Sequence, residues 1–441
     1  MQLLIYTERT SNRLTYIFDF IFFDLLGLEY SLTGDKELFV SHNGPKLSYD
    51  KSAIDDELFL ESVGFLFETD IVMQPIDYIE HENLVGFYPV SERSALPFDM
   101  FASSFLMITL YNEYLVHKKD KHERYRASQS INYTAGFLHK PMINFYSLAL
   151  KKILADKYPQ LKFKEHKFEY IATVDVNEAF AYRGKGFMPN FKGFARSLFL
   201  SNFKEAMGRY RVLTGRKKDP FDTFDDLIDT CKKYAIKTKF FFQVGNKTRL
   251  DKNTAHTYEP FRELIKKVSE KSDVGINLSY GSHASLNVME EEIGRLEYIT
   301  GLKIESNRFH YLRFTLPTTY IVLSAVGITE DYSFGYATRS GFRAATCSPF
   351  YLYNLAKDEQ TNVKIYPFAF MDTTLAHYNK LSARESLEKI LQIMKWVKQA
   401  EGPFIGVWHN TSFVETGVWQ GWKNVFDSVA EQASILTEKS E

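Results

Sequence analysis

Two regions with different hydrophobic patterns follow each other along the chain. Residues 1–150 carry a strand-like apolar run at Leu3–Tyr6, helical apolar spacing over Arg13–Leu28 and a further short β-type run at Glu37–Val40. From residue 165 to residue 441, short β-type runs alternate with helical stretches. This change predicts a smaller N-terminal α/β domain (1–150) followed by a larger domain (165–441).

Repeated strand–helix units dominate the second region. One helical stretch begins with a capping box, Ser382 with Glu385, and continues with apolar residues on one face. Such repetition predicts a parallel sheet in an α/β fold, and seven units suggest a (β/α)7 barrel. The seven predicted strands are Glu169–Val176, Lys237–Val244, Asp273–Leu278, Lys303–Phe309, Gly327–Ser333, Val363–Met371 and Pro403–Trp408.

Polar side chains gather where these predicted strands end. In a barrel of this kind the chemistry lies at the carboxyl ends of the strands, so we expect one shared site there. The candidates are Asp175, Asn177, Asn277, His283, Arg308, His310, Asp331, Asp372 and His409.

Two of these strand-end positions, and Trp408 beside one of them, have a specific chemical interpretation and a structural alternative. Asp175 lies on an apolar strand, where a buried carboxylate needs a partner such as Arg308; the alternatives are a turn-forming Asp and a surface Arg. His409 follows Trp408 at a strand end and suits proton transfer near neutral pH, unless it is a structural histidine. Trp408 could stack on a sugar face or pack in the core.

Composition narrows the classes of partner and compartment. The net charge is -1, which gives no basic footprint for nucleic acid, and two cysteines exclude a disulfide framework or a cysteine-rich zinc site. The apolar stretch 16–28 is interrupted by Asp19 and Asp24, so a membrane span is not expected. With no signal peptide pattern at the N-terminus, we expect a cytoplasmic protein.

The segment His117–Arg126 (HKKDKHERYR) is strongly charged. A solvated loop is the favoured interpretation, and an anion-binding patch is the alternative.

Several short motifs together resemble a branch of the polysaccharide deacetylase superfamily (NodB homology) that has an extra N-terminal α/β domain. They include TVDVNEAFAYRGKGF, VGINLSYGS, NRFHYLRFTLPTTY, IYPFAFMDTTL and VWHN. The resemblance implies a distorted (β/α)7 barrel that hydrolyses the N-acetyl group of an amino sugar, a C–N bond that is not a peptide bond. It also implies a divalent metal, zinc or similar, held by one Asp and two His, which polarises the carbonyl and activates a water.

The resemblance also implies roles for individual residues. Asp175 matches the general base, Arg308 the arginine that orients it and His409 the acid that protonates the leaving amine. Asp331, His310, Trp408 and Asp372 would shape the substrate pocket.

At the metal positions the chain departs from the family pattern. Asn177 stands where the branch has an aspartate and Asn277 where it has a histidine, and His283 could supply an imidazole nearby. Asparagine offers only a neutral amide oxygen, so a metal would be held weakly or not at all.

Three hypotheses remain for an N-acylated saccharide or a smaller N-acylated ligand. The first is a metal-dependent deacetylase with a rebuilt site. The second is a pseudoenzyme or carbohydrate-binding module that has lost the metal. The third is a metal-free hydrolase that acts through Asp175 and His409.

Overall fold

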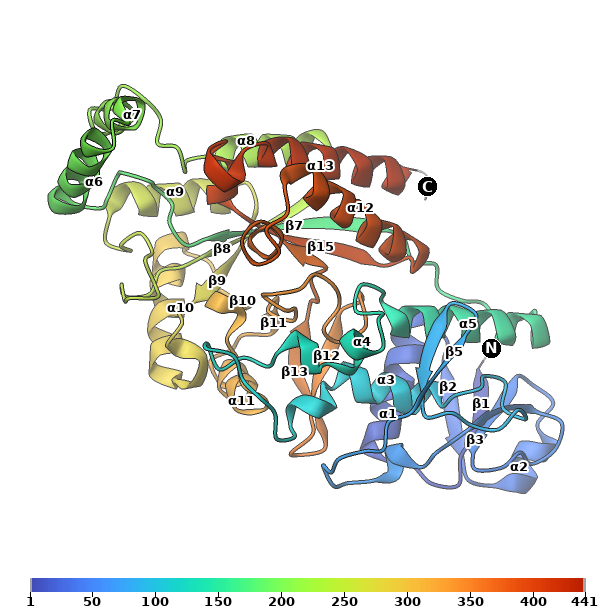
Figure 1. Ribbon diagram of the computed structural model, residues 1–441. Coiled ribbons are helices and arrows are strands. Elements are labelled where there is room, and N and C mark those ends of the chain that lie inside the picture. Colours follow the sequence, from blue (N-terminus) through green and yellow to red (C-terminus); the bar gives the residue numbers. More distant parts are fainter. Residues whose placement is uncertain (1, 439–441) are drawn as a thin grey trace.

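The computed structural model describes residues 2–438, which form two sheets flanked by helices (Figure 1). The N-terminal part contains a four-stranded parallel sheet in the order β2-β1-β3-β4. Its strands are β1 (Leu3–Tyr6), β2 (Tyr30–Thr33), β3 (Lys46–Asp50) and β4 (Leu58–Glu61). A separate antiparallel hairpin pairs β5 (Tyr78–His81) with β6 (Leu84–Phe87).

The helices of this part begin and end at residues that the sequence makes suitable. Helix α1 (Asn12–Phe18) is capped by the Ser11 side chain and continues as the π-helical segment η1 (Asp19–Leu25). Gly27 follows with a positive φ of 65°, a conformation that glycine adopts without strain. Further helices here are α3 (Met100–Ile108), capped by Asp99, α4 (Ile131–Thr134) and α5 (Met142–Lys157).

The strand predicted at Glu37–Val40 is wrong, because these residues lie in helix α2 (Lys36–Ser41). The Asp35 carboxylate accepts hydrogen bonds from the backbone N–H groups of Glu37 and Leu38. This N-cap favours a helical turn over the extended conformation.

The C-terminal part contains a nine-stranded sheet in the order β12-β13-β11-β10-β9-β8-β7-β15-β14, parallel except for the β12–β13 hairpin. The predicted run Val363–Met371 is divided between β13 and β14, and β12 was not predicted. The strands are β7 (Glu169–Val176), β8 (Lys237–Phe242), β9 (Asp273–Leu278), β10 (Ser306–Phe309), β11 (Glu330–Asp331), β12 (Phe350–Asn354), β13 (Glu359–Ile365), β14 (Phe370–Met371) and β15 (Pro403–His409).

One face of this sheet encloses a small apolar cluster that is distinct from the main core. The cluster joins Phe241 of β8 to Tyr332 after β11, and also to Met371 of β14 and Val407 of β15. Side chains from both halves of the strand order therefore meet, as expected for a strongly curved sheet. Closure of the sheet into a (β/α)7 barrel stays a prediction, since the hydrogen-bonded order ends at β12 and β14.

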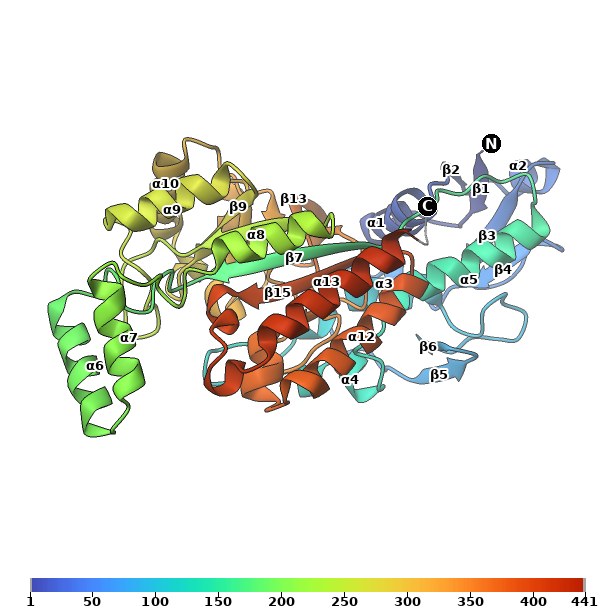
Figure 2. The same ribbon diagram turned by 90° about the horizontal axis from the view of Figure 1, so that it is seen from above.

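Helices cover the other face of the sheet (Figure 2). Helix α12 begins at the predicted capping box, in which Ser382 and Glu385 bond reciprocally, and its apolar face packs inward. These helices are α8 (Phe224–Lys233), α9 (Glu259–Ser269), α10 (Leu286–Thr300), α11 (Thr318–Ala325), α12 (Ala383–Gln399) and α13 (Trp422–Glu438).

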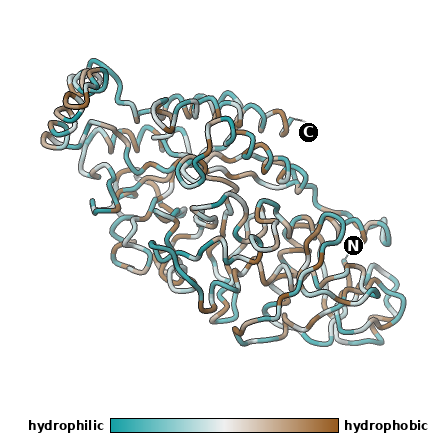
Figure 3. Tube along the Cα trace, viewed as in Figure 1, coloured by the Kyte–Doolittle hydropathy of each residue, from teal (hydrophilic) through white to brown (hydrophobic). Residues whose placement is uncertain are grey.

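A helical hairpin, α6 (Phe187–Phe199) and α7 (Phe203–Leu213), projects from the connection between β7 and α8 (Figures 1 and 2). Apolar and polar positions alternate along it, while it stands apart from both sheets (Figure 3). No helix among residues 2–438 has the length and apolar character needed to cross a membrane.

The N-terminal part and the β12–β13 hairpin share one hydrophobic core. The Tyr16 ring lies 4.8 Å from the Tyr353 ring, and its hydroxyl donates to the Tyr351 carbonyl. Arg13 of α1 is fully buried and donates to the Asp358 carboxylate at 3.2 Å and to the Thr69 carbonyl at 2.8 Å. The division into domains 1–150 and 165–441 stays a prediction, since these contacts cross it.

We expect Arg13→Met to lower the free energy of unfolding by about 2–3 kcal/mol. The Thr69 carbonyl loses its donor and the Asp358 carboxylate loses its cation. Urea unfolding followed by circular dichroism measures the change. Arg384→Met is the matched control, because Arg384 is exposed and its i,i+4 pair with Glu388 should contribute at most about 0.5 kcal/mol. If both substitutions lower the free energy of unfolding equally, Arg13 does not stabilise the contact between the two parts of the chain.

Candidate functional site

A buried ion pair crosses the inner face of the curved sheet. The Arg308 guanidinium donates to the Asp175 carboxylate from Nη1 at 2.8 Å, to Thr173 Oγ1 at 2.9 Å and to the Tyr332 carbonyl at 2.9 Å. Arg308 is 0% exposed and Asp175 is 6% exposed. The predicted partnership of Asp175 with Arg308 is present in the structure, and it fixes the carboxylate at the end of β7.

An aromatic ring supports this pair from one side. The guanidinium carbon of Arg308 lies 4.7 Å from the centre of the Phe241 ring, in cation–π range. Gly275 on the neighbouring strand makes room for that ring, because a Cβ there would come within 2.6 Å of it. The triple Phe of β8 thus supplies one side chain to the site, while Phe240 and Phe242 belong to the main core.

His409 forms the second polar pair of the site, with Asp372. Its Nδ1 lies 2.7 Å from Asp372 Oδ1, and its backbone N–H donates to Oδ2 at 2.7 Å. Burial alone would lower the pKa of His409, but the carboxylates of Asp372 and, to a smaller extent, Asp175 raise it above its ordinary value. Asp372 therefore favours the protonated imidazolium and orients the ring.

The two asparagines at the expected metal positions bond to each other. Asn277 Nδ2 donates to Asn177 Oδ1 at 3.2 Å, and the buried Asn277 Oδ1 has no hydrogen-bond partner. Within residues 2–438 no group of three or more His, Cys, Asp or Glu side chains is placed to hold a metal ion. This donor set does not fit a zinc-type ion, since one amide oxygen is already used and imidazole and carboxylate ligands are not assembled around it.

His310 and Asp251 form a third pair, of which only His310 was predicted as a site residue. His310 Nδ1 lies 2.8 Å from Asp251 Oδ1, which also accepts from Gln243 Nε2 and from the Tyr280 backbone N–H. Burial would raise the pKa of Asp251, yet hydrogen bonds from His310, the Tyr280 backbone N–H and the Thr248 hydroxyl lower it. Asp251 lies in a loop with no motif around it, so nothing in the sequence marked it.

These pairs border one cavity of about 180 Å³. Asp175 and Asn177 lie on its β7 side, and His310 and His409 border it from other strands. Other lining residues are Arg124, Phe309, Tyr311, Leu312, Ala337, Met371, Thr373 and Tyr378. The structure thus brings four predicted site residues to one cleft, and Arg124 from the N-terminal part reaches it as well.

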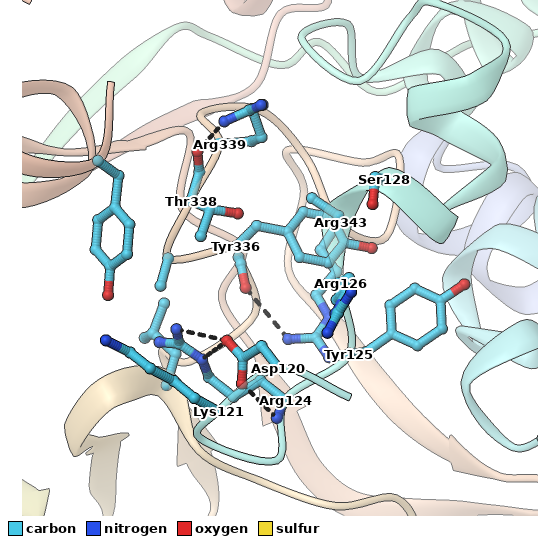
Figure 4. Close-up of a pocket in the computed structure, with 15 residues that line it drawn as sticks. Asp120, Lys121, Arg124, Tyr125, Arg126, Ser128, Tyr336, Thr338, Arg339 and Arg343 are labelled. Carbon is cyan, nitrogen blue, oxygen red and sulfur yellow. Dashed lines mark hydrogen bonds and ion pairs between the residues drawn. The ribbon is translucent and has the colours of Figure 1, made fainter. Parts of the chain in front are cut away.

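A larger cavity of about 530 Å³ lies beside this cleft, and Arg124, Leu312, Ala337 and Tyr378 line both (Figure 4). Its wall is rich in cations. Arg124 pairs with Asp120 and Arg343 with Glu113. Among the described residues, no carboxylate forms an ion pair with the other three cations, Lys121, Arg126 and Arg339. Much of the segment 117–126 is therefore part of a cavity wall rather than only a solvated loop.

Three predicted residues lie away from the cleft. Trp408 is fully buried on the helix side of the sheet, where its Nε1 donates to the Tyr170 hydroxyl and its ring packs on Phe426. It does not line the pocket, because it alternates with the inward-facing Val407 along β15. Asp331 is fully buried and accepts from Asn307, Tyr320 and Ser333, so it joins strands and helix α11.

His283 is the third. Its Nδ1 bonds with Arg313 Nη1 at 3.0 Å, and it is not among the residues that line the cleft. The guanidinium thus occupies one of the two ring nitrogens of His283. Burial, together with the nearby charge of Arg313, lowers the pKa of His283.

Comparisons with family profiles and with solved structures both give matches. A family profile described as a family of unknown function (DUF7033) matches residues 3–159. A search of curated protein sequences finds no match.

Solved structures similar to this chain include polysaccharide deacetylases, at low identity. One, described as a candidate polysaccharide deacetylase from Mycobacterium smegmatis, is 12% identical with a TM-score of 0.39, over 63% of this chain and 92% of that chain. A polysaccharide deacetylase from Bacillus cereus is 12% identical with a TM-score of 0.29, over 61% of this chain and 88% of that chain. A CE4 family pseudoenzyme from Bacillus anthracis is 9% identical with a TM-score of 0.32, over 61% and 62%.

We expect Asp372→Asn to lower the pKa of His409, because the anion that favours the imidazolium is removed. The folded-state pKa of His409 lies above its unfolded value. Its contribution to stability is therefore fully present below about pH 6.5 and is lost as the pH rises through the folded pKa. The stability difference between wild type and variant should shrink accordingly between about pH 6 and about pH 9.

The pKa is read from the NMR pH titration of the His409 ring, and the stability difference from urea unfolding at both pH values. His139, which packs beside Trp396 elsewhere, serves as the internal control and should titrate alike in both proteins. An unchanged titration of His409 would show that Asp372 does not set its protonation.

Proposed function

We propose that the cleft bordered by Asp175, Asn177, His310 and His409 binds an N-acylated saccharide without a divalent metal. The chain would then be a carbohydrate-binding relative of the polysaccharide deacetylases, as its motifs suggest. The observation that carries this proposal is the hydrogen bond from Asn277 to Asn177, 3.2 Å long. This bond joins the two positions where the family pattern has metal ligands. Neutral amides stand there in place of the carboxylate and the imidazole of that pattern.

The site retains polar groups that suit a sugar. The Asn177 amide and the imidazoles of His310 and His409 can exchange hydrogen bonds with hydroxyl and acetamide groups. Tyr311 and Tyr378 offer aromatic faces in the same cavity.

The neighbouring cavity favours a saccharide that carries a carboxylate or phosphate. Lys121, Arg126 and Arg339 contribute positive charge to its wall without an ion-paired carboxylate among the described residues, and the wall is continuous with the cleft through Arg124. Guanidinium groups bind such anions through short charge-assisted hydrogen bonds. An extended acidic oligosaccharide would place its N-acyl group in the cleft and its anionic group in the larger cavity.

Hydrolysis is the second candidate function, and the retained acid–base geometry favours it. Asp175, held by Arg308, would take a proton from water, and the resulting hydroxide would attack the acyl carbon. As the C–N bond breaks, the protonated His409 would give its proton to the leaving nitrogen. Without an electrophile at the carbonyl, general acid–base catalysis contributes only about 10²–10⁴-fold per group, so this route suits an activated acyl group.

We expect the double substitution Asn177→Asp with Asn277→His to create zinc binding that the wild type lacks. The two changes return a carboxylate and an imidazole to neighbouring positions. Isothermal titration with zinc measures the affinity, and each single variant is a control that should bind much more weakly. Tight, stoichiometric zinc binding by the wild type would refute the metal-free proposal.

An assay of acetate release distinguishes the two candidate functions, binding and hydrolysis. Acetate release from an N-acetylated oligosaccharide is measured with chelator present. Release by the wild type that His409→Ala abolishes would establish the metal-free hydrolase instead of the binding module.

We expect Arg126→Ala with Arg339→Ala to weaken binding of an N-acetylated oligosaccharide containing uronic acid roughly tenfold, through loss of charge-assisted bonds. Binding of a neutral N-acetylated oligosaccharide should change little. Titration calorimetry at low and at physiological salt measures both ligands, and the exposed Arg384→Ala is the control. If the wild type prefers the neutral sugar, the anionic ligand class is wrong; if it binds neither, the saccharide proposal falls.

A further inference from the structure

The projecting hairpin α6–α7 buries as many polar as apolar side chains. Asn190 and Ser197 of α6 are buried, and so are Ala206 and Val212 of α7. The Asn190 amide donates to the carbonyls of Tyr182 and Gly186, and its oxygen accepts from Arg209 Nη1 of α7 at 3.2 Å. One polar contact, from Arg209 to Asn190, thus joins the two helices, and their buried apolar contribution is small for a helical hairpin.

The large apolar side chains of the hairpin face solvent instead. Phe187 is 80% exposed, Phe199 88% and Phe203 66%, and the rings of Phe187 and Phe191 stack on each other with centres 5.9 Å apart. The other exposed large apolar residues of the hairpin and its loop are Met188, Leu198, Leu200, Met207, Tyr210 and Leu213. An apolar surface of this size marks an interaction site, because scattered single residues are the rule elsewhere.

Cations accompany this apolar surface. Residues 187–218 contain eight Lys and Arg residues and a single acidic residue, Glu205, in a chain whose net charge is -1. Glu205 pairs with Arg209, so no acidic residue of this segment is left to pair with the other cations. Those exposed to solvent are Lys192, Arg196, Lys204, Arg211, Arg216, Lys217 and Lys218, the last of which lies 3.8 Å from the carboxylates of Asp222 and Asp225 beyond the hairpin.

We propose that the α6–α7 hairpin binds the surface of a membrane that contains anionic lipid. Exposed Phe and Leu side chains enter the boundary between headgroups and acyl chains, and flanking Lys and Arg pair with lipid phosphates. A second copy of the chain is disfavoured as the occupant, because two hairpins face to face would bring their unbalanced positive charges together. Since neither helix can span a bilayer, the hairpin lies in the interface.

Vesicle co-sedimentation of the full chain tests this proposal independently of the saccharide cleft. The wild type should bind phosphatidylglycerol vesicles, bind phosphatidylcholine vesicles far less, and lose binding as salt increases. Phe187→Ser with Phe199→Ser and Phe203→Ser should abolish binding. Lys192→Glu with Lys204→Glu should weaken it by roughly fivefold or more per charge changed.

Controls separate a lipid surface from general stickiness and from misfolding. Met73→Ser with Tyr298→Ser removes two side chains that are 83% and 78% exposed elsewhere, and should leave vesicle binding unchanged. Thermal unfolding should be the same for all variants, since every substituted side chain faces solvent. The proposal is overturned if the wild type ignores anionic vesicles or if the hairpin variants bind like the wild type. The wild type could instead form a dimer that does not bind vesicles. If the hairpin substitutions then convert this dimer to a monomer, the apolar surface is a self-association site.

Discussion

The buried ion pair between Arg308 and Asp175 is the constraint around which the candidate site is arranged. A guanidinium with no solvent exposure is costly unless its donors are satisfied, and here β7 and the end of β11 both supply acceptors. The pair therefore requires strands distant in the sequence to keep their register and curvature. The same requirement places Asp175 beside His409 of β15, its partner in the strand pairing.

The site contains the same type of interaction three times, namely a carboxylate that lies close to a guanidinium or an imidazole. Asp175 pairs with Arg308, Asp372 with His409 and Asp251 with His310. In each case the partner orients a group that could otherwise rotate, and in low dielectric such orientation is strongly enforced. The Asn177–Asn277 pair is the exception, because both members are neutral and a hydrogen bond between two amides joins them.

Much of the sheet was predictable because strand periodicity and helix caps are local signals. All seven predicted runs contain strands of the structure, and the capping box at Ser382 begins α12 as expected. It was harder to predict which face of the sheet each side chain lies on. Side chains alternate along β15, so Trp408 lies on one face and Val407 and His409 on the other, but the alternation does not tell which face borders the cleft. Asp251 and the wall built by Lys121 and Arg126 depend on loops meeting across long sequence distances, and no periodicity encodes such a meeting. The β12 strand was not predicted, and the strand predicted at Glu37–Val40 is a helix, because the N-cap at Asp35 outweighs a β-type composition.

The core shared by α1 and the β12–β13 hairpin has a consequence for how the protein gains its structure. Phe20 packs on Phe350 and Tyr16 on Tyr353, so neither sheet has a complete apolar interior by itself. A fragment beginning after residue 165 would leave those rings of the hairpin facing water, and a fragment ending there would do the same to α1. The two halves are therefore expected to denature in a single cooperative step, and separating them by proteolysis would leave two aggregation-prone pieces.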